Sequence, residues 1–370
     1  MRYFISTFIV LFFLFIIVSC NNKAKNTLSI KTINGSNIGV EYSIQYVDSL
    51  NRNIQKQIDS ILNVINLSVD VKTKNSLVAQ FNSGDSCTSI DNHFLDLFLL
   101  SDEVYEITDG AFDPTVKPLL DIWGFGDEKL NFENSNINQK LNLSSLSTLD
   151  KINTLVNNSI DHIGWDLLTL KGDILTNSEG DGGSNFICKD DKMVQIGFDA
   201  MIQGYTVDII SEFMQYNLGI NDFIIDFGGR IMAQGNKPDL SKWVIQLENP
   251  FLNSSGKSSV LNFEMVKYRS ISKSNSNKFV EIDGKKYYSF IDPRTGLNNE
   301  RQIINAVIFA NDCAIADAYA TSFITMGIEE AVPLIESNPY EGVEAYFIYL
   351  TEDGSIETYI STGLEDVFKK

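Results

Sequence analysis

The amino-acid sequence predicts an α+β protein with mostly antiparallel sheets and packed helices. The predicted strands and helices follow one another in mixed order, whereas a doubly wound parallel sheet needs regular alternation. Several neighbouring segments have the form of hairpins, which join antiparallel strands. The chain has 370 residues, of which 44% are apolar and only 7 are proline, so it can bury a large core.

The charge of the chain limits the partners that it can bind. It contains 29 Lys and Arg against 48 Asp and Glu, which gives a formal net charge of −19. Because such an acidic protein lacks the basic surface that a phosphate backbone requires, we expect no nucleic-acid partner. A small anionic ligand is still compatible with this composition, since the charge of a local site can oppose the net charge of the chain.

The cysteines do not predict a disulfide framework, because four in 370 residues are too few. Cys87, Cys188 and Cys313 are far apart and show no Cys-x-x-Cys spacing. We expect these three to be buried or half-buried free thiols, and we expect neither a zinc site nor a Cys/His nucleophile pair.

The N-terminus has the pattern of a bacterial lipoprotein signal. The apolar run after Arg2 spans about 16 residues, fewer than the ~20 that a bilayer span needs. It ends in Ile-Val-Ser-Cys, which resembles a lipobox, so we expect a signal peptide over 1–19, lipid on Cys20 and a polar tether over 20–32. The protein would then be exported and lipid-anchored to a bacterial cell membrane, facing the periplasm or the outside. The alternative is an uncleaved anchor.

The remaining residues, 33–370, are predicted to form a single domain without internal repeats. Helices are expected where apolar residues recur at helical spacing, and strands where β-branched and aromatic residues cluster. Asp91 has the character of an N-cap, and Gly110 follows the end of the same helix. In the N-terminal half these signals predict a strand over 38–47, helices over 49–68 and 91–108, a surface excursion over 131–158 and a hairpin or loop over 177–192.

The C-terminal half carries stronger signals. A buried strand is predicted to end at Gly228-Gly229, and a helix rich in small residues follows the last but one strand. The predicted elements are a helix over 203–216, strands over 223–227, 243–247 and 304–309, a helix over 313–326 and a strand over 344–350.

Two segments in this order carry more Gly, Asp and Thr than a core needs. The first, 110–126, begins Gly-Ala-Phe-Asp-Pro-Thr and could present backbone amides and aromatic walls to a ligand. Its structural interpretation is a helix end and a tight connection. The second, 199–205, opens a helix whose N-terminal amides could hold phosphate, although a helix cap by Asp199 is the simpler interpretation.

Two further segments lie near the C-terminus. Residues 291–296 (Ile-Asp-Pro-Arg-Thr-Gly) predict a turn in which Arg294 could offer a guanidinium fork to phosphate. Asp317 and Thr321 stand at i and i+4 among alanines, so their oxygens share a helix face and could hold Mg²⁺. If Asp317 is such a ligand, Asp317→Ala is expected to remove the Mg²⁺ response and leave the fold intact.

The order of these segments resembles the FAD:protein FMN transferase family, the ApbE flavin transferases. The resemblance runs from about residue 33 to beyond 325, nearly the whole mature chain. Six motifs in family order carry it, and they occupy 76–82, 110–126, 203–208, 225–229, 291–296 and 312–321.

The resemblance implies a T-fold-like α+β architecture and an enzyme that uses FAD as substrate with Mg²⁺. Such enzymes transfer FMN from FAD to a Thr or Ser hydroxyl of an exported or membrane flavoprotein and release AMP. The metal ligands map onto Asp317, Thr321 and the backbone carbonyl of Ala200. Positions that contact the flavin nucleotide or assist the reaction map onto Ile38, Ala111, Phe112, Asp113, Gln203, Asp292 and Arg294.

The chain departs from the family pattern at two functional positions. Gln203 stands where the family most often has Lys, and Ser289 stands where it usually has His. His93 and His162 are the only histidines, and neither lies in a motif. Two alternatives to a transferase therefore follow, a non-catalytic FAD-binding lipoprotein and an FAD pyrophosphatase that forms FMN and AMP. A solute-binding lipoprotein is disfavoured, because the retained motifs are transferase motifs.

Overall fold

The computed structural model describes residues 28–126, 147–172, 185–252, 258–265, 269–275, 278–298, 302–337, 340 and 342–368. The predicted signal peptide, Cys20 and most of the predicted tether lie outside these ranges. The first strand begins at Ile30, so the end of the 20–32 segment belongs to a sheet rather than to a tether.

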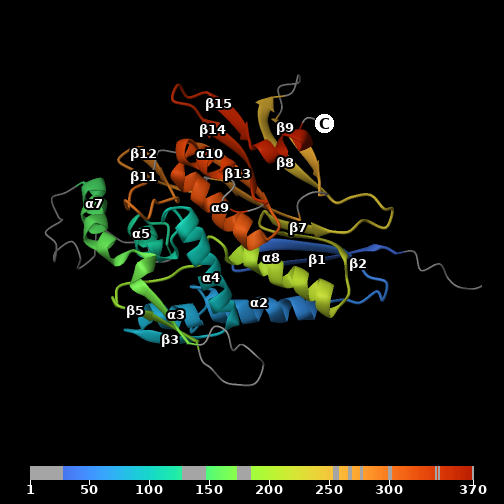
Figure 1. Ribbon diagram of the computed structural model, residues 1–370, viewed down its shortest axis with the longest axis horizontal. Helices are drawn as coiled ribbons and strands as arrows, with labels where there is room; N and C mark the ends of the chain where they lie inside the picture. Colours follow the sequence, from blue (N-terminus) through green and yellow to red (C-terminus); the bar gives the residue numbers. More distant parts are fainter. Residues whose placement is uncertain are drawn as a thin grey trace, which may run out of the picture.

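One antiparallel sheet of eight strands organises the protein (Figure 1). Its spatial order is β1-β2-β6-β7-β10-β13-β14-β15, and every pairing between neighbours is antiparallel. This confirms the predicted α+β class. The strands are β1 Ile30–Asn37, β2 Val40–Val47, β6 Asp222–Phe227, β7 Arg230–Gln234, β10 Ser270–Asn275, β13 Ile303–Ala310, β14 Glu344–Leu350 and β15 Ile356–Ile360.

The central strand β13 is apolar along nearly its whole length because both faces of the sheet are covered. Ala306 and Ile308 belong to the core beneath the helices. Val307 and Phe309 belong to a second core under the hairpin of β8 (Val244–Leu252) and β9 (Ser258–Glu264). A strand buried on both faces loses the polar alternation that a half-exposed strand shows.

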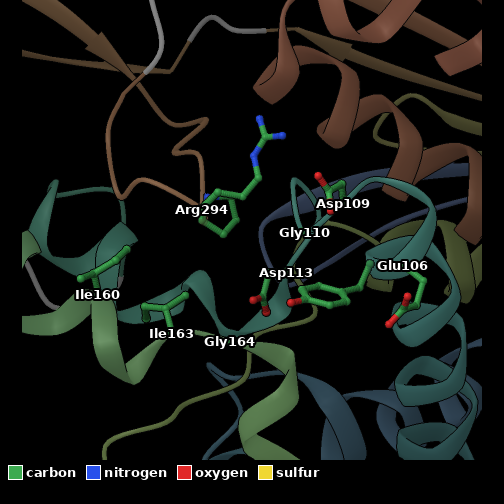
Figure 2. A pocket seen from close by; sticks show the side chains of 10 residues that line it. Glu106, Asp109, Gly110, Asp113, Ile160, Ile163, Gly164 and Arg294 are labelled. Carbon is green, nitrogen blue, oxygen red and sulfur yellow. The ribbon is translucent and has the colours of Figure 1, made fainter. Parts of the chain in front are cut away.

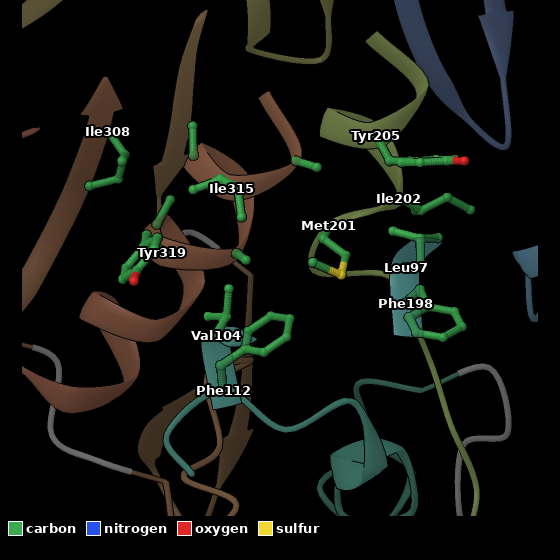
Figure 3. Close-up of a cluster of buried hydrophobic side chains, with 14 of the residues drawn as sticks. Leu97, Val104, Phe112, Phe198, Met201, Ile202, Tyr205, Ile308, Ile315 and Tyr319 are labelled. Atoms are coloured by element: carbon green, nitrogen blue, oxygen red, sulfur yellow. The ribbon is translucent and has the colours of Figure 1, made fainter. Parts of the chain in front are cut away.

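Most of the helices lie on the face of the sheet opposite this hairpin, whereas the short C-terminal helix α11 follows Leu364, a residue of the core under the hairpin (Figure 1). Helices α8 and α9 lie against the strands, and α2 and α4 pack against these two helices. Side chains of α4, α8 and α9 meet in the cluster drawn in Figure 3, where Val104, Ile202 and Ile315 are labelled. The helices are α2 Gln55–Val69, α3 Leu77–Ser83, α4 Asn92–Ile107, α5 Lys117–Ile122, α7 Thr148–Ser159, α8 Ile202–Glu212, α9 Cys313–Met326, α10 Ile328–Glu336 and α11 Glu365–Phe368.

Several predicted boundaries are confirmed. Helix α9 and strand β14 have the predicted limits, and the Asp91 side chain caps α4 by accepting the N–H of Phe94 at 3.0 Å. The excursion predicted over 131–158 is wrong in its second half, where Ser147 caps the helix α7. Ile152 and Val156 of this helix are buried against Leu119 and Ile122, a contact that the Asn-rich composition conceals.

A disulfide contradicts the prediction of free thiols at Cys87 and Cys188. The two residues stand opposite each other in β3 (Cys87–Ile90) and β5 (Asn185–Lys189), which form a small sheet with β4 (Leu168–Lys171). Their separation of 101 residues hides the pairing from the sequence. Cys313 is a free, buried thiol as expected. In the part of the chain that the structure describes, no helix is long and apolar enough to cross a membrane.

Helices α8 and α9 approach each other closely at Gly204. A Cβ atom on Gly204 would stand 2.3 Å from the carbonyl oxygen of Cys313, the first residue of α9. Contact with backbone cannot be relieved by a rotamer change, so the absence of a side chain sets the distance between the helices.

We expect Gly204→Ala to lower the free energy of unfolding by about 1–3 kcal/mol, the typical cost of overpacking. Helix propensity alone predicts the opposite, a gain of up to ~1 kcal/mol in a helix interior. Urea denaturation of both proteins separates the two effects. A variant as stable as the wild type would show that the helices separate at no cost.

Candidate functional site

A cavity of about 220 Å³ brings together the four segments that the sequence singled out. Each segment contributes to its wall, although they are far apart in the chain. The lining includes Ala111, Phe112, Asp113, Lys117, Gly197, Asp199, Ala200, Ser289, Phe290, Ile291, Pro293, Thr321 and Thr325. Thr321 and Ala200, two of the three predicted metal ligands, therefore face one space.

A second cavity of about 300 Å³ adjoins the first, since Asp113 and Pro293 line both (Figure 2). Its wall is more acidic and includes Glu106 and Asp109 from the end of α4 and its following turn. Neither histidine of the described chain lines either cavity. His93 instead contacts the Tyr205 hydroxyl at 2.8 Å, and His162 pairs with Asp191.

Asp113 lies between the two cavities and is almost fully buried. Its Oδ1 accepts hydrogen bonds from the backbone N–H and the hydroxyl of Thr115, both at 2.7 Å. Burial, which penalises the charged form, raises the pKa of this carboxyl to about 6 despite these bonds. Asp113 therefore changes charge near neutral pH at the centre of the site.

Because the pKa of Asp113 is higher in the folded than in the unfolded chain, its protonation favours folding. This contribution is complete below about pH 4 and is lost as the pH rises through about 6. As the pH rises from 4 to 7, the free energy of unfolding of Asp113→Asn should increase relative to that of the wild type by roughly 3 kcal/mol at most. Denaturation of both proteins across this range tests the assignment, and a constant difference would refute it.

Asp292 and Arg294 form a closed pair in the turn at 291–296. The guanidinium donates from Nε to Oδ1 at 2.9 Å and from Nη2 to Oδ2 at 2.8 Å, while its Nη1 bonds Glu330 at 2.9 Å. Figure 2 shows the Arg294 side chain pointing away from Asp113. The Arg294 guanidinium, which we expected to bind phosphate, is thus bound by two carboxylates. These contacts hold the shape of the turn.

Asp317 is fully buried and its carboxylate is bonded on both oxygens. Oδ1 accepts from Arg230 Nε at 2.8 Å and from the Ser272 hydroxyl at 3.2 Å, and Oδ2 accepts the backbone N–H of Gly204 at 3.2 Å. Burial raises the pKa of Asp317, and the charge of Arg230 opposes that rise. The expected metal ligand is therefore also the centre of an ion pair.

Arg230 was not predicted from the sequence as a site residue. It directly follows the Gly228-Gly229 turn at the start of β7, and its position after a glycine pair on a core strand is the only local signal. Gln203 lies by the same turn, with its buried Oε1 unpartnered among the described residues. Ile38 forms the tip of the β1–β2 hairpin with a φ of +53°, and Val40, two residues further along the chain, lies beside Gly228. Arg230 contacts Asp317 directly and Gln203 precedes Gly204, whose N–H bonds Asp317, so these two residues lie beside Asp317. None of Arg230, Gln203 and Ile38 lines the 220 Å³ cavity.

The two central helices also cap each other. Asp317 of α9 accepts the N–H of Gly204 in the first turn of α8. Asp208 of α8 accepts the N–H groups of Cys313 and Ala314, both at 2.8 Å, at the start of α9. Met201, rather than Asp199, occupies the N-cap position of α8. Asp208, within the 203–208 motif, thus has a structural role that local patterns cannot show.

The fold and these cavities define an α+β protein that gathers four distant segments around a ligand-sized site. The chain belongs to the ApbE family, whose model matches residues 38–347. The expected family membership is confirmed.

Curated relatives cover nearly the same length. The chain is similar to the FAD:protein FMN transferases of Vibrio cholerae, with 24% identity over 344 residues (91% of this chain, 92% of the relative), and of Escherichia coli K12, with 23% over 355 residues (93% and 92%). Among solved structures it resembles the flavin transferase ApbE from V. cholerae, with a TM-score of 0.73 and 22% identity (92% of this chain, 99% of that one). It also resembles the apo flavinyl transferase ApbE from Pseudomonas stutzeri, with a TM-score of 0.74 and 22% identity (93% and 98%). These likenesses confirm the fold.

Proposed function

We propose that this protein is an FAD:protein FMN transferase. The observation that carries the proposal is the convergence of four sequence segments on one cavity, three of them family motifs, in a chain that belongs to the ApbE family. In the proposed reaction, a Thr or Ser oxygen of an exported acceptor protein attacks the FMN phosphorus of FAD. The new P–O bond replaces the bond to the AMP phosphate, AMP leaves, and the hydroxyl proton passes to a base or to water.

We propose Mg²⁺ as the cofactor, held by Asp317, Thr321 and the carbonyl of Ala200. These are oxygen ligands, which Mg²⁺ prefers, and Thr321 and Ala200 line the same cavity. The positively charged Arg230 guanidinium lies 2.8 Å from Asp317 Oδ1. This contact supports the carboxylate as a binding position for a cation. Bound there, Mg²⁺ would neutralise pyrophosphate charge.

The absence of a histidine at the cavity makes a slow reaction the expected one. Ser289 lines the cavity at the family's histidine position, and neither histidine reaches the lining. A general base contributes about 10²–10⁴ in rate. The same observation leaves two alternative functions for the protein. One is an FAD-binding lipoprotein without activity, and the other is an FAD pyrophosphatase in which water replaces the acceptor.

The decisive experiment incubates the protein with FAD, Mg²⁺ and an acceptor protein that carries an exposed threonine. Mass spectrometry of the acceptor and chromatography of the nucleotides read the outcome. FMN on the acceptor with equimolar AMP supports the transferase. Free FMN with AMP indicates the pyrophosphatase, and unchanged FAD indicates a binding protein. An acceptor with the threonine replaced by valine is the control.

We also propose export and lipid anchoring through Cys20. The Cys87–Cys188 disulfide supports this compartment, because structural disulfides persist where the environment is oxidising. We expect the mature N-terminus to be Cys20 carrying diacylglycerol, and Cys20→Ser to release the protein from the membrane fraction. Mass spectrometry of the N-terminal peptide provides the measurement. An intact Met1 on the mature protein would overturn the proposal.

A further inference from the structure

We propose that Arg230 is the resident cation of Asp317, and that a divalent cation binds this carboxylate only by displacing the Arg230 guanidinium. Arg230 would thus set the affinity of the site for metal. The inference rests on the metal part of the proposed function, and it concerns a residue that the sequence motifs do not single out.

The first argument is the closeness of the ion pair. Arg230 Nε lies 2.8 Å from Asp317 Oδ1, and Nη1 donates to the Gly228 carbonyl at 3.1 Å. Asp317 has no exposed surface, and among its described partners Arg230 alone is charged. In a poorly solvated place, a unit positive charge against one carboxylate oxygen strongly repels a second cation at that oxygen. The two cations are therefore expected to exclude each other.

The second argument is that Arg230 can leave while Asp317 stays in place. The Arg230 side chain is 16% exposed and sits on the first residue of β7, whereas Ser272 is fully buried. Ser272 and the Gly204 N–H hold the carboxylate from other directions. Withdrawal of the guanidinium therefore frees part of Oδ1 without moving α9. Thr321, one turn along α9, already lines the cavity.

The test measures cation binding directly, by Mn²⁺ electron paramagnetic resonance and by calorimetry with Mg²⁺, on the full chain without FAD. The apparent affinity equals the intrinsic affinity multiplied by the fraction of protein that is competent to bind. If the Arg230–Asp317 ion pair is closed about nine-tenths of the time, it therefore weakens metal binding about tenfold. We expect Arg230→Gln to bind Mn²⁺ about tenfold more tightly or better. Arg230→Lys keeps the charge and should remain close to the wild type.

Asp317→Asn and the double variant Arg230→Gln/Asp317→Asn complete the set. Both should lose the tight site, and the double variant leaves no buried charge unpaired, so it controls for misfolding. Thermal unfolding of Arg230→Gln supplies a second measurement, because Mg²⁺ should raise its melting temperature more than that of the wild type.

The outcomes separate this inference from the proposed function. Unchanged Mn²⁺ affinity in Arg230→Gln, together with a loss in Asp317→Asn, would overturn the role of Arg230 and keep the metal site. No binding in any variant would overturn the metal site and this inference together. The acceptor assay measures FMN transfer separately, so a failure of the metal site can be told apart from a failure of the transferase activity.

Discussion

Asp317→Ala is expected to lower the free energy of unfolding by about 3–5 kcal/mol, because it leaves the Arg230 guanidinium without its counter-ion in a largely buried place. It also removes the acceptor for the Gly204 N–H at the start of α8. The expectation from sequence alone, that this substitution leaves the fold intact, is therefore revised. Chemical denaturation in EDTA measures the loss without any contribution from metal.

The double variant Arg230→Met/Asp317→Ala is the matched control. It removes both charges, and replacement of a buried ion pair by apolar groups is often close to neutral. We expect it to recover most of the stability that Asp317→Ala loses. If Asp317→Ala alone is as stable as the wild type, the ion pair is not part of the folded protein in solution.

Loss of the Cys87–Cys188 disulfide is expected to lower the stability by about 2–4 kcal/mol. The bond closes a loop with a sequence separation of 101 residues, and a long loop restricts the unfolded chain strongly. The measurement compares thermal unfolding with and without reductant for the wild type and for Cys87→Ser/Cys188→Ser. The double variant should have the same melting temperature as the reduced wild type, and this temperature should not change when reductant is added.

Cys313→Ala provides the control for the thiol chemistry. Cys313 is buried and unbonded, so this variant should keep the full response to reductant. A wild type whose melting temperature is the same in both conditions would show that Cys87 and Cys188 are not linked in the purified protein.

The site was predicted in outline because its parts are short and chemically distinctive. The segments around Asp113, Ala200, Ile291 and Thr321 were each ambiguous alone, and a resemblance in their order connected them. In the structure these segments line one cavity. The structure also shows that Arg294, expected to face phosphate, is bound by Asp292 and Glu330. A guanidinium pairs with whichever carboxylates the fold brings near, and local sequence does not identify them.

The fold class and several elements of this protein follow from sequence patterns alone. Helix 313–326 and strand 344–350 were predicted at their observed limits, since local periodicity and caps depend on residues a few positions apart. Three pairs become visible only in the folded chain: Arg230–Asp317, Asp208–Cys313 and Cys87–Cys188, whose members are 87, 105 and 101 residues apart. The physical reason is that ion pairs, caps and disulfides depend on distance in space. The antiparallel sheet and the close packing of α8 on α9 set that distance, and neither leaves a periodic pattern near the residues concerned.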